Sequence, residues 1–245
     1  MKRAVVLGVG GLGCPAALAL CEGAAARGLQ LTLRLVDDDR VERSNLSRQV
    51  LFRERDTGSL KAHAACERLR ALCPEAFAGP HPVALEPVAA RFDEQTASQL
   101  LAGADVLLDG TDSFETRFLA NDRALAGRVP LVHGAVLQWT GQLLAVLPGG
   151  PCLRCLFEGP PPPGAVPACA QAGVASPLCG LVGAEMAAEA LRLLSATPAR
   201  AAGRLLRWEA LHARFRTVAI PRDPACPACG PAQERVAARA DLVHG

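Results

Sequence analysis

The chain has 245 residues, of which 50% are hydrophobic and 20% charged, and its 26 basic residues nearly balance its 24 acidic ones. This composition is that of a soluble globular protein, and the near-neutral charge excludes nucleic acid and membrane surfaces as bulk electrostatic partners. The most apolar late segment, 178–194, contains Glu185, Glu189 and Arg192, so no stretch is free of charge for long enough to span a bilayer. We therefore expect a cytoplasmic protein.

The N-terminal segment has the basic and apolar order of a secretory leader but not its cleavage site. Leu20 is large where processing requires a small residue, and the glycines and Pro15 are spaced for a turn and a helix start. We expect this segment to remain in the fold as its first strand and helix.

Strand and helix patterns alternate through the first half of the chain. Buried strands are predicted at 3–9 and 104–110, and further strands at 31–37, 82–88 and 129–136. Helices are predicted at 13–27, 58–72, 93–103 and 113–127. Strands that alternate with helices of ten or more residues favour a mostly parallel sheet covered on both faces. The sequence therefore predicts a Rossmann-like α/β fold.

The pattern changes in the second half of the chain, where hairpin-like strands are predicted to extend the sheet. Strands are expected at 141–149, 203–211 and 214–220, a helix at about 179–195, and a proline-rich exposed loop at 159–177. We interpret the whole chain, 1–245, as a single domain. Its expected parts are a nucleotide-binding half at 1–137, a carrier-binding and zinc half at 138–230, and a tail at 231–245.

A glycine-rich turn joins the first predicted strand to the first helix. Gly8, Gly10 and Gly13 have G-x-G-x-x-G spacing, and Gly11 lies within the turn. Backbone N–H groups and the helix dipole can meet a phosphate there, while Asp37, at the end of the second strand, suits a ribose hydroxyl. A nicotinamide dehydrogenase and an ATP enzyme both fit these features, as does a turn that only packs the helix on the strand.

The polar segment that follows the second predicted strand favours ATP. Arg48 and Lys61 can supply cations to the β- and γ-phosphates, and Asn45 can hydrogen-bond phosphate or ribose. We count Asp39 and Gln49, in the same region, among the candidate nucleotide-binding residues. A nicotinamide pocket has no use for such a polar run, although an ordinary solvated loop would have a similar composition.

A buried strand at 105–109 ends in a candidate magnesium site. Asp112 follows it at the sheet edge where open α/β sheets bind ligands, and Mg²⁺ commonly binds one or two carboxylates together with substrate phosphates. Ser113, beside it, belongs to the same candidate site. A structural alternative is that Asp112 caps the helix that begins at Ser113.

Two C-x-x-C pairs indicate a metal site. Cys152, Cys155, Cys226 and Cys229 supply four thiolates, which suit a tetrahedral structural zinc. The remaining cysteines other than Cys169 lie in mostly apolar helical settings and are expected to be small core residues; they are Cys14, Cys21, Cys66, Cys73 and Cys179. His133 can line the nucleotide site, but we expect a hydrogen-bonded core histidine.

Taken together, these motifs resemble the ThiF/MoeB/HesA family, the bacterial relatives of ubiquitin-activating enzymes. The resemblance runs from about residue 4 to 230 and rests on several ordered motifs. They are GVGGLGCPAA, LVDDDRVERSNLSRQVLF, Lys61, DGTDSFETRFLAND, PLVHGAV, GPCLRCLF, CAQAGVASPLCGLVGAEMAAEALRLL and CPACG.

The resemblance implies a reaction and a role for each matching residue. In that family the glycine turn and the aspartate matching Asp37 hold ATP. The asparagine and arginine matching Asn45 and Arg48 act with the lysine matching Lys61 on the phosphates, and the aspartate matching Asp112 serves Mg²⁺. The implied reaction is adenylation of the C-terminal glycine of a small ubiquitin-like or sulfur-carrier protein with a Gly-Gly end.

The resemblance also implies partners and a second chemical step. The family is dimeric, so we expect a homodimer or a hetero-complex with the carrier. Cys169 stands where some members keep a cysteine that takes up the activated acyl group or sulfur, whereas others receive sulfur from an external donor. The alternative for Cys169 is that it only packs the proline-rich loop.

Two departures from the family pattern bear on activity. The family usually carries an N-terminal helix with an arginine that completes the partner subunit's site, whereas Met1 here almost adjoins the first strand. Ser113 stands where the family commonly has asparagine. The competing hypotheses are an NAD-dependent oxidoreductase and a non-catalytic zinc-containing scaffold that binds a ubiquitin-like protein.

Overall fold

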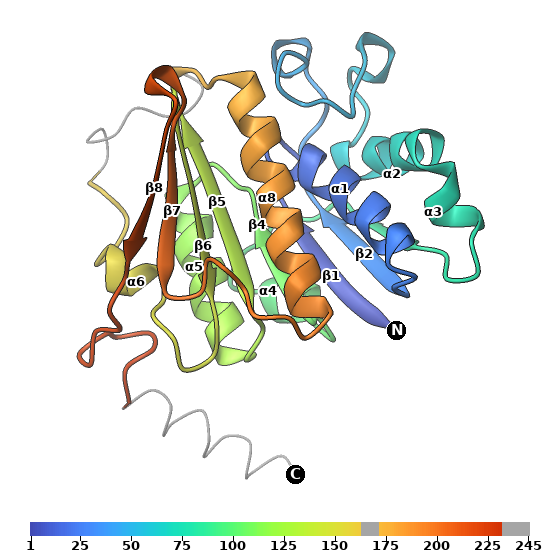
Figure 1. Ribbon diagram of the computed structural model, residues 1–245. Helices are drawn as coiled ribbons and strands as arrows, with labels where there is room; N and C mark the ends of the chain where they lie inside the picture. The colour runs from blue at the N-terminus through green and yellow to red at the C-terminus, as the bar shows by residue number, and fades with distance from the viewer. Residues whose placement is uncertain (163–171, 232–245) are drawn as a thin grey trace.

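The computed structural model describes residues 1–162 and 172–231, in which eight strands form one sheet of order β3-β2-β1-β4-β5-β6-β7-β8 (Figure 1). The strands are β1 (Lys2–Leu7), β2 (Leu31–Val36), β3 (Ala84–Val88), β4 (Val106–Asp109), β5 (Leu131–Leu137), β6 (Thr140–Val146), β7 (Arg204–Glu209) and β8 (Arg214–Ala219). The first five run parallel, and β6, β7 and β8 join antiparallel. The predicted parallel sheet with an antiparallel extension is confirmed.

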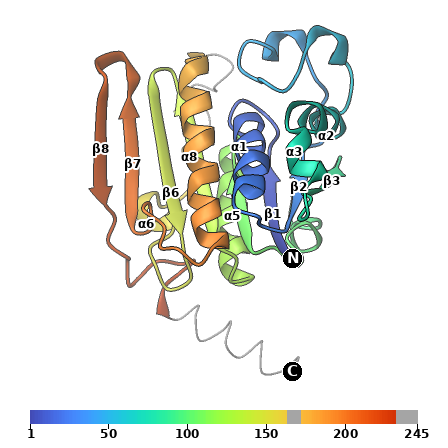
Figure 2. The ribbon, with the colours of Figure 1, turned by 45° about the vertical axis from the view of Figure 1, so that its right-hand side comes forward.

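Helices cover both faces of this sheet (Figures 1 and 2). One apolar core lies under α1 (Gly13–Ala26), α2 (Lys61–Leu72), α3 (Pro74–Ala78) and α8 (Ser176–Leu194). A second core, on the opposite face, includes residues of α4 (Ala97–Leu100), α5 (Phe114–Ala126) and α6 (Leu153–Leu156). Three short 3₁₀ helices lie between these elements, at Arg43–Asn45, Glu54–Asp56 and Ala210–His212.

The central parallel strands are apolar because both of their faces are covered. All four residues of β4 are buried, as are five of the six in β2. Pro87 lies in β3, an edge strand of the sheet, where a missing backbone N–H does least harm. Since parallel strands end at one edge of a sheet, the turns that follow β1, β2 and β4 lie close together there.

Two glycines of the β5–β6 hairpin bring α8 close to the sheet. A Cβ atom at Gly134 would lie 2.3 Å from the Met186 sulfur, and one at Gly141 would lie 2.7 Å from Val182 Cγ2. On its other side α8 contacts α1, where a Cβ at Gly183 would lie 2.6 Å from the carbonyl oxygen of Leu12. The second half of the chain therefore packs directly on the glycine turn that precedes α1.

The structure shortens one predicted helix and lengthens another. Of the helix expected at 93–103 only the four residues of α4 are helical. The Asp93 carboxylate accepts the backbone N–H groups of Gln95 and Thr96, which forms a turn instead. In contrast, α8 begins at Ser176, three residues before the expected start, with proline in its first turn.

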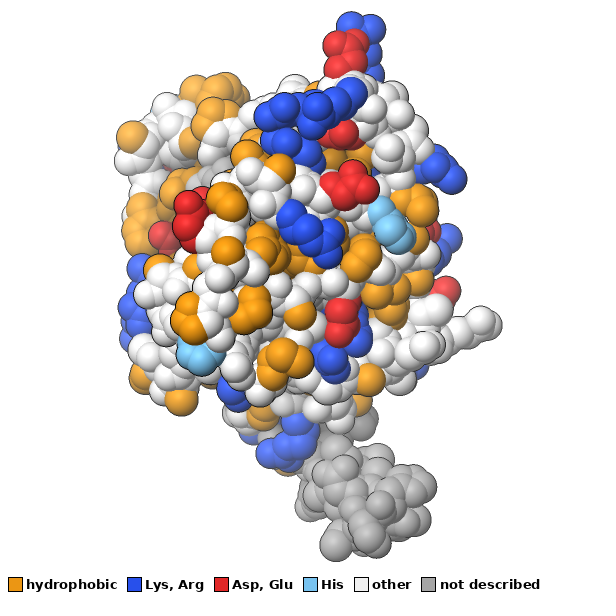
Figure 3. All heavy atoms as spheres, turned by 90° about the vertical axis from the view of Figure 1, so that its right-hand side faces the viewer, with side chains coloured by type: hydrophobic (Ala, Val, Ile, Leu, Met, Phe, Trp, Pro, Cys, Tyr) orange, Lys and Arg blue, Asp and Glu red, His pale blue; other side chains and the backbone are white. Residues whose placement is uncertain are grey.

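The segment between β2 and α2 projects from the body of the molecule (Figure 1). Figure 3 views the molecule from the right-hand side of Figure 1, and it shows Lys and Arg side chains gathered toward the top, with Asp and Glu side chains among them. Two ion pairs lie in this segment, Arg43 with Glu54 at 3.1 Å and Arg55 with the neighbouring Asp56 at 3.8 Å. Within the described residues, no helix combines the length and the apolar character needed to cross a membrane.

Candidate functional site

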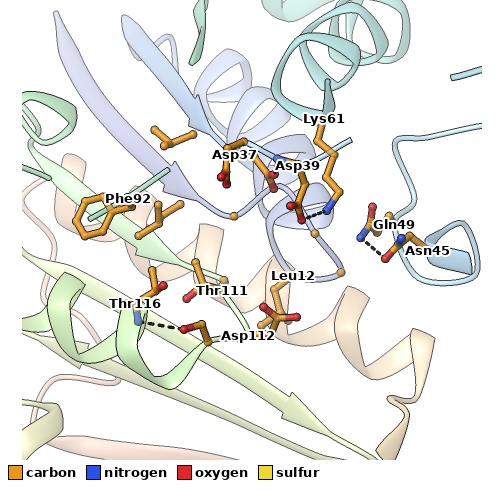
Figure 4. Close-up of a pocket in the computed structure, with 18 of the residues that line it drawn as sticks. Leu12, Asp37, Asp39, Asn45, Gln49, Lys61, Phe92, Thr111, Asp112 and Thr116 are labelled. Atoms are coloured by element: carbon orange, nitrogen blue, oxygen red, sulfur yellow. Dashed lines mark hydrogen bonds and ion pairs between the residues drawn. The ribbon is translucent and has the colours of Figure 1, made fainter. Parts of the chain in front are cut away.

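A cavity of about 540 Å³ lies where the turns after β1, β2 and β4 meet. Figure 4 shows Asp37, Asp39 and Lys61 on one side of it and Thr111, Asp112 and Thr116 on the other. The predicted site residues that line the cavity are Gly8, Gly10, Gly11, Asp37, Asp39, Asn45, Arg48, Gln49, Lys61, Asp112 and Ser113. The structure therefore brings together residues that are up to about a hundred positions apart in the sequence.

The glycine turn needs its glycines for different reasons. Gly8 has φ +81°, and a Cβ there would lie 3.1 Å from Thr111 Cγ2 across the cavity floor. Gly13 is not among the lining residues: a Cβ at Gly13 would lie only 1.9 Å from the Gly8 carbonyl oxygen, so this glycine lets α1 pack on β1. No side chain caps the N-terminus of α1, which suits an anionic ligand.

Asp37, at the end of β2, is engaged by the backbone. Its carboxylate accepts the N–H of Val9 at 2.6 Å and the N–H of Asp39 at 2.9 Å. Burial raises the pKa of Asp37, while the Lys61 ammonium and these backbone donors act in the opposite direction. Each oxygen keeps a lone pair for a further donor, so its predicted contact with a ribose hydroxyl stays a prediction.

Lys61 reaches the cavity from the first turn of α2. The ammonium lies 2.7 Å from the Asp39 carboxylate, and the Lys61 N–H donates to the Asp39 carbonyl at 3.0 Å. The lysine side chain is 8% exposed, whereas that of Asp39 is 69% exposed. The site therefore contains a nearly buried cation whose present partner is a solvated carboxylate.

Asn45 organises the polar segment that follows β2. Its side-chain oxygen accepts hydrogen bonds from Arg48 Nη2 at 2.9 Å and from Gln49 Nε2 at 3.1 Å. The Gln49 side chain is buried, and its Oε1 atom has no hydrogen-bond partner among the described residues. A buried acceptor without a donor is costly, so the network of Asn45, Arg48 and Gln49 is only partly satisfied by the described residues.

Asp112 and Ser113 follow β4 in the turn that leads into α5. Ser113, not Asp112, is the N-cap of α5: its hydroxyl oxygen accepts the N–H of Thr116 at 3.3 Å, and the hydroxyl donates to Glu115 at 2.7 Å. The structural alternative for Asp112 is therefore wrong. The Asp112 carboxylate is exposed and makes no hydrogen bond to any residue that the structure describes.

A buried hydrogen-bonded pair lies beneath this turn. Asp109, the last residue of β4, is fully buried and lies 2.8 Å from Nδ1 of His133 on β5. Burial alone would raise the pKa of Asp109, but the hydrogen bond and charge of His133, together with Arg117, lower it below the ordinary value. His133 is not among the cavity residues, so the prediction of a hydrogen-bonded core histidine is confirmed.

Several lining residues were not predicted from the sequence. They are Leu7, Leu12, Val36, Asp38, Arg40, Glu42, Ala90, Arg91, Phe92, Gly110, Thr111, Thr116, Arg117, Val136, Val174 and Cys179. Arg117 is 8% exposed, donates twice to the Thr111 carbonyl and lies over the Phe114 ring. A useful signal was its position one helical turn after the predicted helix start, which directs it back toward that terminus.

The four cysteines of the two C-x-x-C pairs come together at α6, away from the cavity. Their Sγ atoms all lie within 4.8 Å of one another, with 3.7 Å between Cys152 and Cys226 and 3.4 Å between Cys155 and Cys229. Four sulfurs around zinc, with Zn–S bonds of about 2.3 Å, lie about 3.8 Å apart, so the cluster fits this ion. The prediction that the two pairs form one site is confirmed.

The other predicted core cysteines are all buried; they are Cys14, Cys21, Cys66, Cys73 and Cys179. Burial raises the pKa of Cys66 to about 11 and that of Cys14 to about 12, which keeps both thiols protonated and unreactive. Cys179 also lines the cavity. Cys169 lies outside the described residues, so its predicted role stays a prediction.

Comparison with known proteins identifies the family. The model of the ThiF family matches residues 1–228. This chain belongs to the ThiF family. The family resemblance of the sequence motifs is therefore confirmed over nearly all of the chain.

Curated relatives of this ThiF-family chain carry names that describe an activity. The chain is 45% identical over 229 residues to the SAMP-activating enzyme E1 of Haloferax volcanii, covering 94% of this chain and 80% of the relative. It is 44% identical over 238 residues to the sulfur carrier protein adenylyltransferase of Thermus thermophilus, covering 94% and 83%.

Solved structures confirm the fold. Escherichia coli MccB, solved with ATP, matches with a TM-score of 0.76 at 19% identity over 94% of this chain and 67% of that protein. MccB in complex with N-formylated MccA matches with a TM-score of 0.78 at 20% identity, again over 94% and 67%. The ThiF-family sheet and its antiparallel extension therefore recur in MccB.

Proposed function

We propose that this chain is an adenylyltransferase that uses ATP to activate the C-terminal glycine of a small sulfur-carrier or ubiquitin-like protein ending in Gly-Gly. The observation that carries the proposal is the cavity itself. It combines an uncapped helix N-terminus, the cations of Arg48 and Lys61 and the carboxylate of Asp112. The names of the two curated relatives support both the adenylyl transfer and the class of carrier.

The chemistry explains why the cavity needs cations. A carboxylate oxygen of the carrier attacks the α-phosphorus of ATP, the bond between that phosphorus and the oxygen bridging to the β-phosphate breaks, and pyrophosphate leaves. Because the carboxylate is already ionised, no general base is required. The two reactants are both anions, so charge neutralisation and positioning account for most of the catalysis. Arg48 and Lys61 are the catalytic residues that we assign to this task.

The remaining cavity residues have binding roles in this proposal. Backbone N–H groups at Gly10 and Gly11 and at the N-terminus of α1 hold the phosphates. Asp37 and Asp39 accept hydrogen bonds from the ribose hydroxyls. When the nucleotide binds, the Lys61 ammonium exchanges its contact with Asp39 for a contact with a phosphate. Gln49 holds Asn45 in place, since its amide donates to the Asn45 side-chain oxygen at 3.1 Å.

We propose Mg²⁺ as the metal of this site. Asp112 offers an exposed carboxylate without a protein partner among the described residues, which fits a hard cation that also binds substrate phosphates. When bound, Mg²⁺ neutralises phosphate charge as pyrophosphate leaves. The Ser113 side chain caps α5, so we assign it no direct contact with the metal.

We propose that Cys152, Cys155, Cys226 and Cys229 hold a structural zinc. All four positions would be filled by protein, which leaves none open for catalysis. The surrounding hydrogen bonds support a rigid site. The side-chain oxygen of Asn121, on α5, accepts the backbone N–H of Leu153, the residue after Cys152, at 2.9 Å. Zinc would join the C-terminal segment to the loop after β6.

We propose further that the carrier docks on residues 138–230 and that the chain works in the cytoplasm as a homodimer. Exposed apolar side chains among these residues support a protein contact; Leu181 is 44%, Trp139 53% and Phe215 56% exposed. A homodimeric mass in sedimentation at micromolar concentration is expected, and a monomer would contradict it unless the carrier replaces the self-contact. Sulfur would come through Cys169 or from an external donor.

The decisive experiment is ATP–pyrophosphate exchange with a Gly-Gly-ended carrier, compared with the same carrier lacking its last glycine. Exchange that requires Mg²⁺ and the intact tail is expected. Binding of the carrier without exchange would indicate the non-catalytic scaffold. Binding of NAD without exchange would indicate the oxidoreductase, so the three hypotheses give different results.

A further inference from the structure

The turn that carries Asp112 is fixed from below by a chain of buried hydrogen bonds. Asp109 Oδ1 accepts both the backbone N–H of Thr111 at 3.0 Å and its hydroxyl at 2.7 Å. The second oxygen, Oδ2, lies 2.8 Å from His133 Nδ1. This series of hydrogen bonds therefore runs from β5, through the end of β4, to the residue that immediately precedes Asp112.

The same turn is fixed from above and from the side. The Thr111 carbonyl accepts two hydrogen bonds from Arg117, at 3.0 and 2.8 Å. A Cβ on Gly110 would lie 3.1 Å from Leu12 Cβ, and one on Gly8 would lie 3.3 Å from Thr111 N. The backbone next to Asp112 therefore has almost no room to move, whereas the Asp112 side chain itself is exposed.

The position of His133 in the sheet determines what it can do. Asp109 and His133 are register partners on adjacent parallel strands, and both are almost completely buried. Because the ionised carboxylate only accepts hydrogen bonds, His133 must donate from Nδ1. A buried polar pair of this kind contributes little net stability compared with apolar residues, so a positioning role accounts for it better than stability does.

We propose that His133 is a positioning residue for the metal: through Asp109 and Thr111 it holds the turn that places the Asp112 carboxylate, and so raises the affinity of the nucleotide site for Mg²⁺. This inference rests on the proposed role of Asp112 as metal ligand. His133 does not touch the cavity and takes no part in the chemical step. Residues behind metal ligands commonly alter metal affinity by about 10- to 100-fold when they are removed.

The test measures metal binding directly, with Mn²⁺ replacing Mg²⁺ and read by electron paramagnetic resonance in the presence of saturating ATP. His133→Leu removes the donor, and Mn²⁺ affinity should fall by about tenfold or more. His133→Asn keeps a donor near the Nδ1 position and should restore affinity to within about twofold of the parent protein. Thr111→Val removes only the hydroxyl donor and covers the case in which His133→Leu does not fold.

A matched control separates positioning from general loss of stability. Glu189 is also fully buried and ion-paired, with Arg200 at 3.0 Å, but it lies on α8 and is not among the cavity residues. Glu189→Gln should lower the melting temperature and leave Mn²⁺ affinity unchanged. Equal losses of Mn²⁺ affinity in Glu189→Gln and His133→Leu would overturn the inference.

Asp112→Ala distinguishes this inference from the proposed function. If Asp112→Ala abolishes Mn²⁺ binding and His133→Leu and Thr111→Val bind it as the parent does, the positioning role is wrong and the metal assignment stands. If Asp112→Ala binds Mn²⁺ normally, both are wrong. If all three variants lose affinity and His133→Asn regains it, the positioning role is established.

Discussion

The cavity and the cysteine cluster are two polar sites built in opposite ways. The cavity gathers the ends of parallel strands and leaves donors and acceptors unpaired, among them Gln49 Oε1 and the Asp112 carboxylate. The cysteine cluster turns four side chains toward one another, with sulfur separations of 3.4 and 3.7 Å. The first site therefore gathers groups around an open cavity, whereas the second would be held together by the proposed ion shared among its four sulfurs.

The variant with the largest expected effect on the cavity is Asp112→Ala. Removing the exposed carboxylate should reduce Mg²⁺-dependent pyrophosphate exchange by about 100- to 1000-fold, because it removes the metal from the developing charge. The melting temperature should change little, since the side chain is exposed and makes no hydrogen bond to a described residue. Exchange near the parental rate would contradict the assignment of Asp112.

Cys226→Ser should have the reverse effect. Loss of a structural metal is among the few single changes that cost about 4 kcal/mol or more, which corresponds to about 8 °C or more in melting temperature for a chain of this size. ATP affinity should change less than about threefold, because the cluster shares no residue with the cavity. Metal analysis of fresh parent protein should give about one zinc per chain, and its absence would refute the site.

Cys169→Ala tests whether the Cys169 thiol takes up the activated carrier after adenylation. Pyrophosphate exchange should survive, because adenylation needs only the cavity, while a reducible covalent adduct between this chain and its carrier should disappear. Mass spectrometry under non-reducing conditions measures the adduct. An undiminished adduct in the variant, or none in the parent protein, would exclude Cys169 as the acceptor and favour an external sulfur donor.

The smallest expected effect belongs to Ser113. Ser113→Ala removes the N-cap of α5 and should cost about 1 kcal/mol, or about 2–4 °C in melting temperature. Ser113→Asn should retain stability, since asparagine caps helices equally well. Half-saturation by Mg²⁺ should be nearly the same in both variants, and a large difference would show that Ser113 contacts the metal.

Sequence patterns predicted the features that depend on short segments. Strands β1, β2 and β4 are mostly buried because both sheet faces are covered, and the glycine turn has local requirements that only glycine meets. The spacing of Cys152 with Cys155, and of Cys226 with Cys229, was enough to predict one shared site. These features do not depend on details of strand register.

Features that depend on register or on competing hydrogen bonds were harder to predict. The contact between Asp109 and His133 requires that β4 and β5 pair in one particular register, which neither strand specifies alone. The choice of Ser113 over Asp112 as helix cap depends on a one-residue shift in where α5 begins. The helix expected at 93–103 was lost to the side-chain bonds of Asp93, which compete with helical ones.

The 74-residue separation between Cys152 and Cys226 has a consequence for biosynthesis. As the chain is made from its N-terminus, the five parallel strands and the cavity turns are complete before the first cysteine pair is translated. That pair must then wait until α8, β7 and β8 have been added before its partners exist. If zinc binds as proposed, its supply during translation limits the completion of the second half of the chain and not of the first.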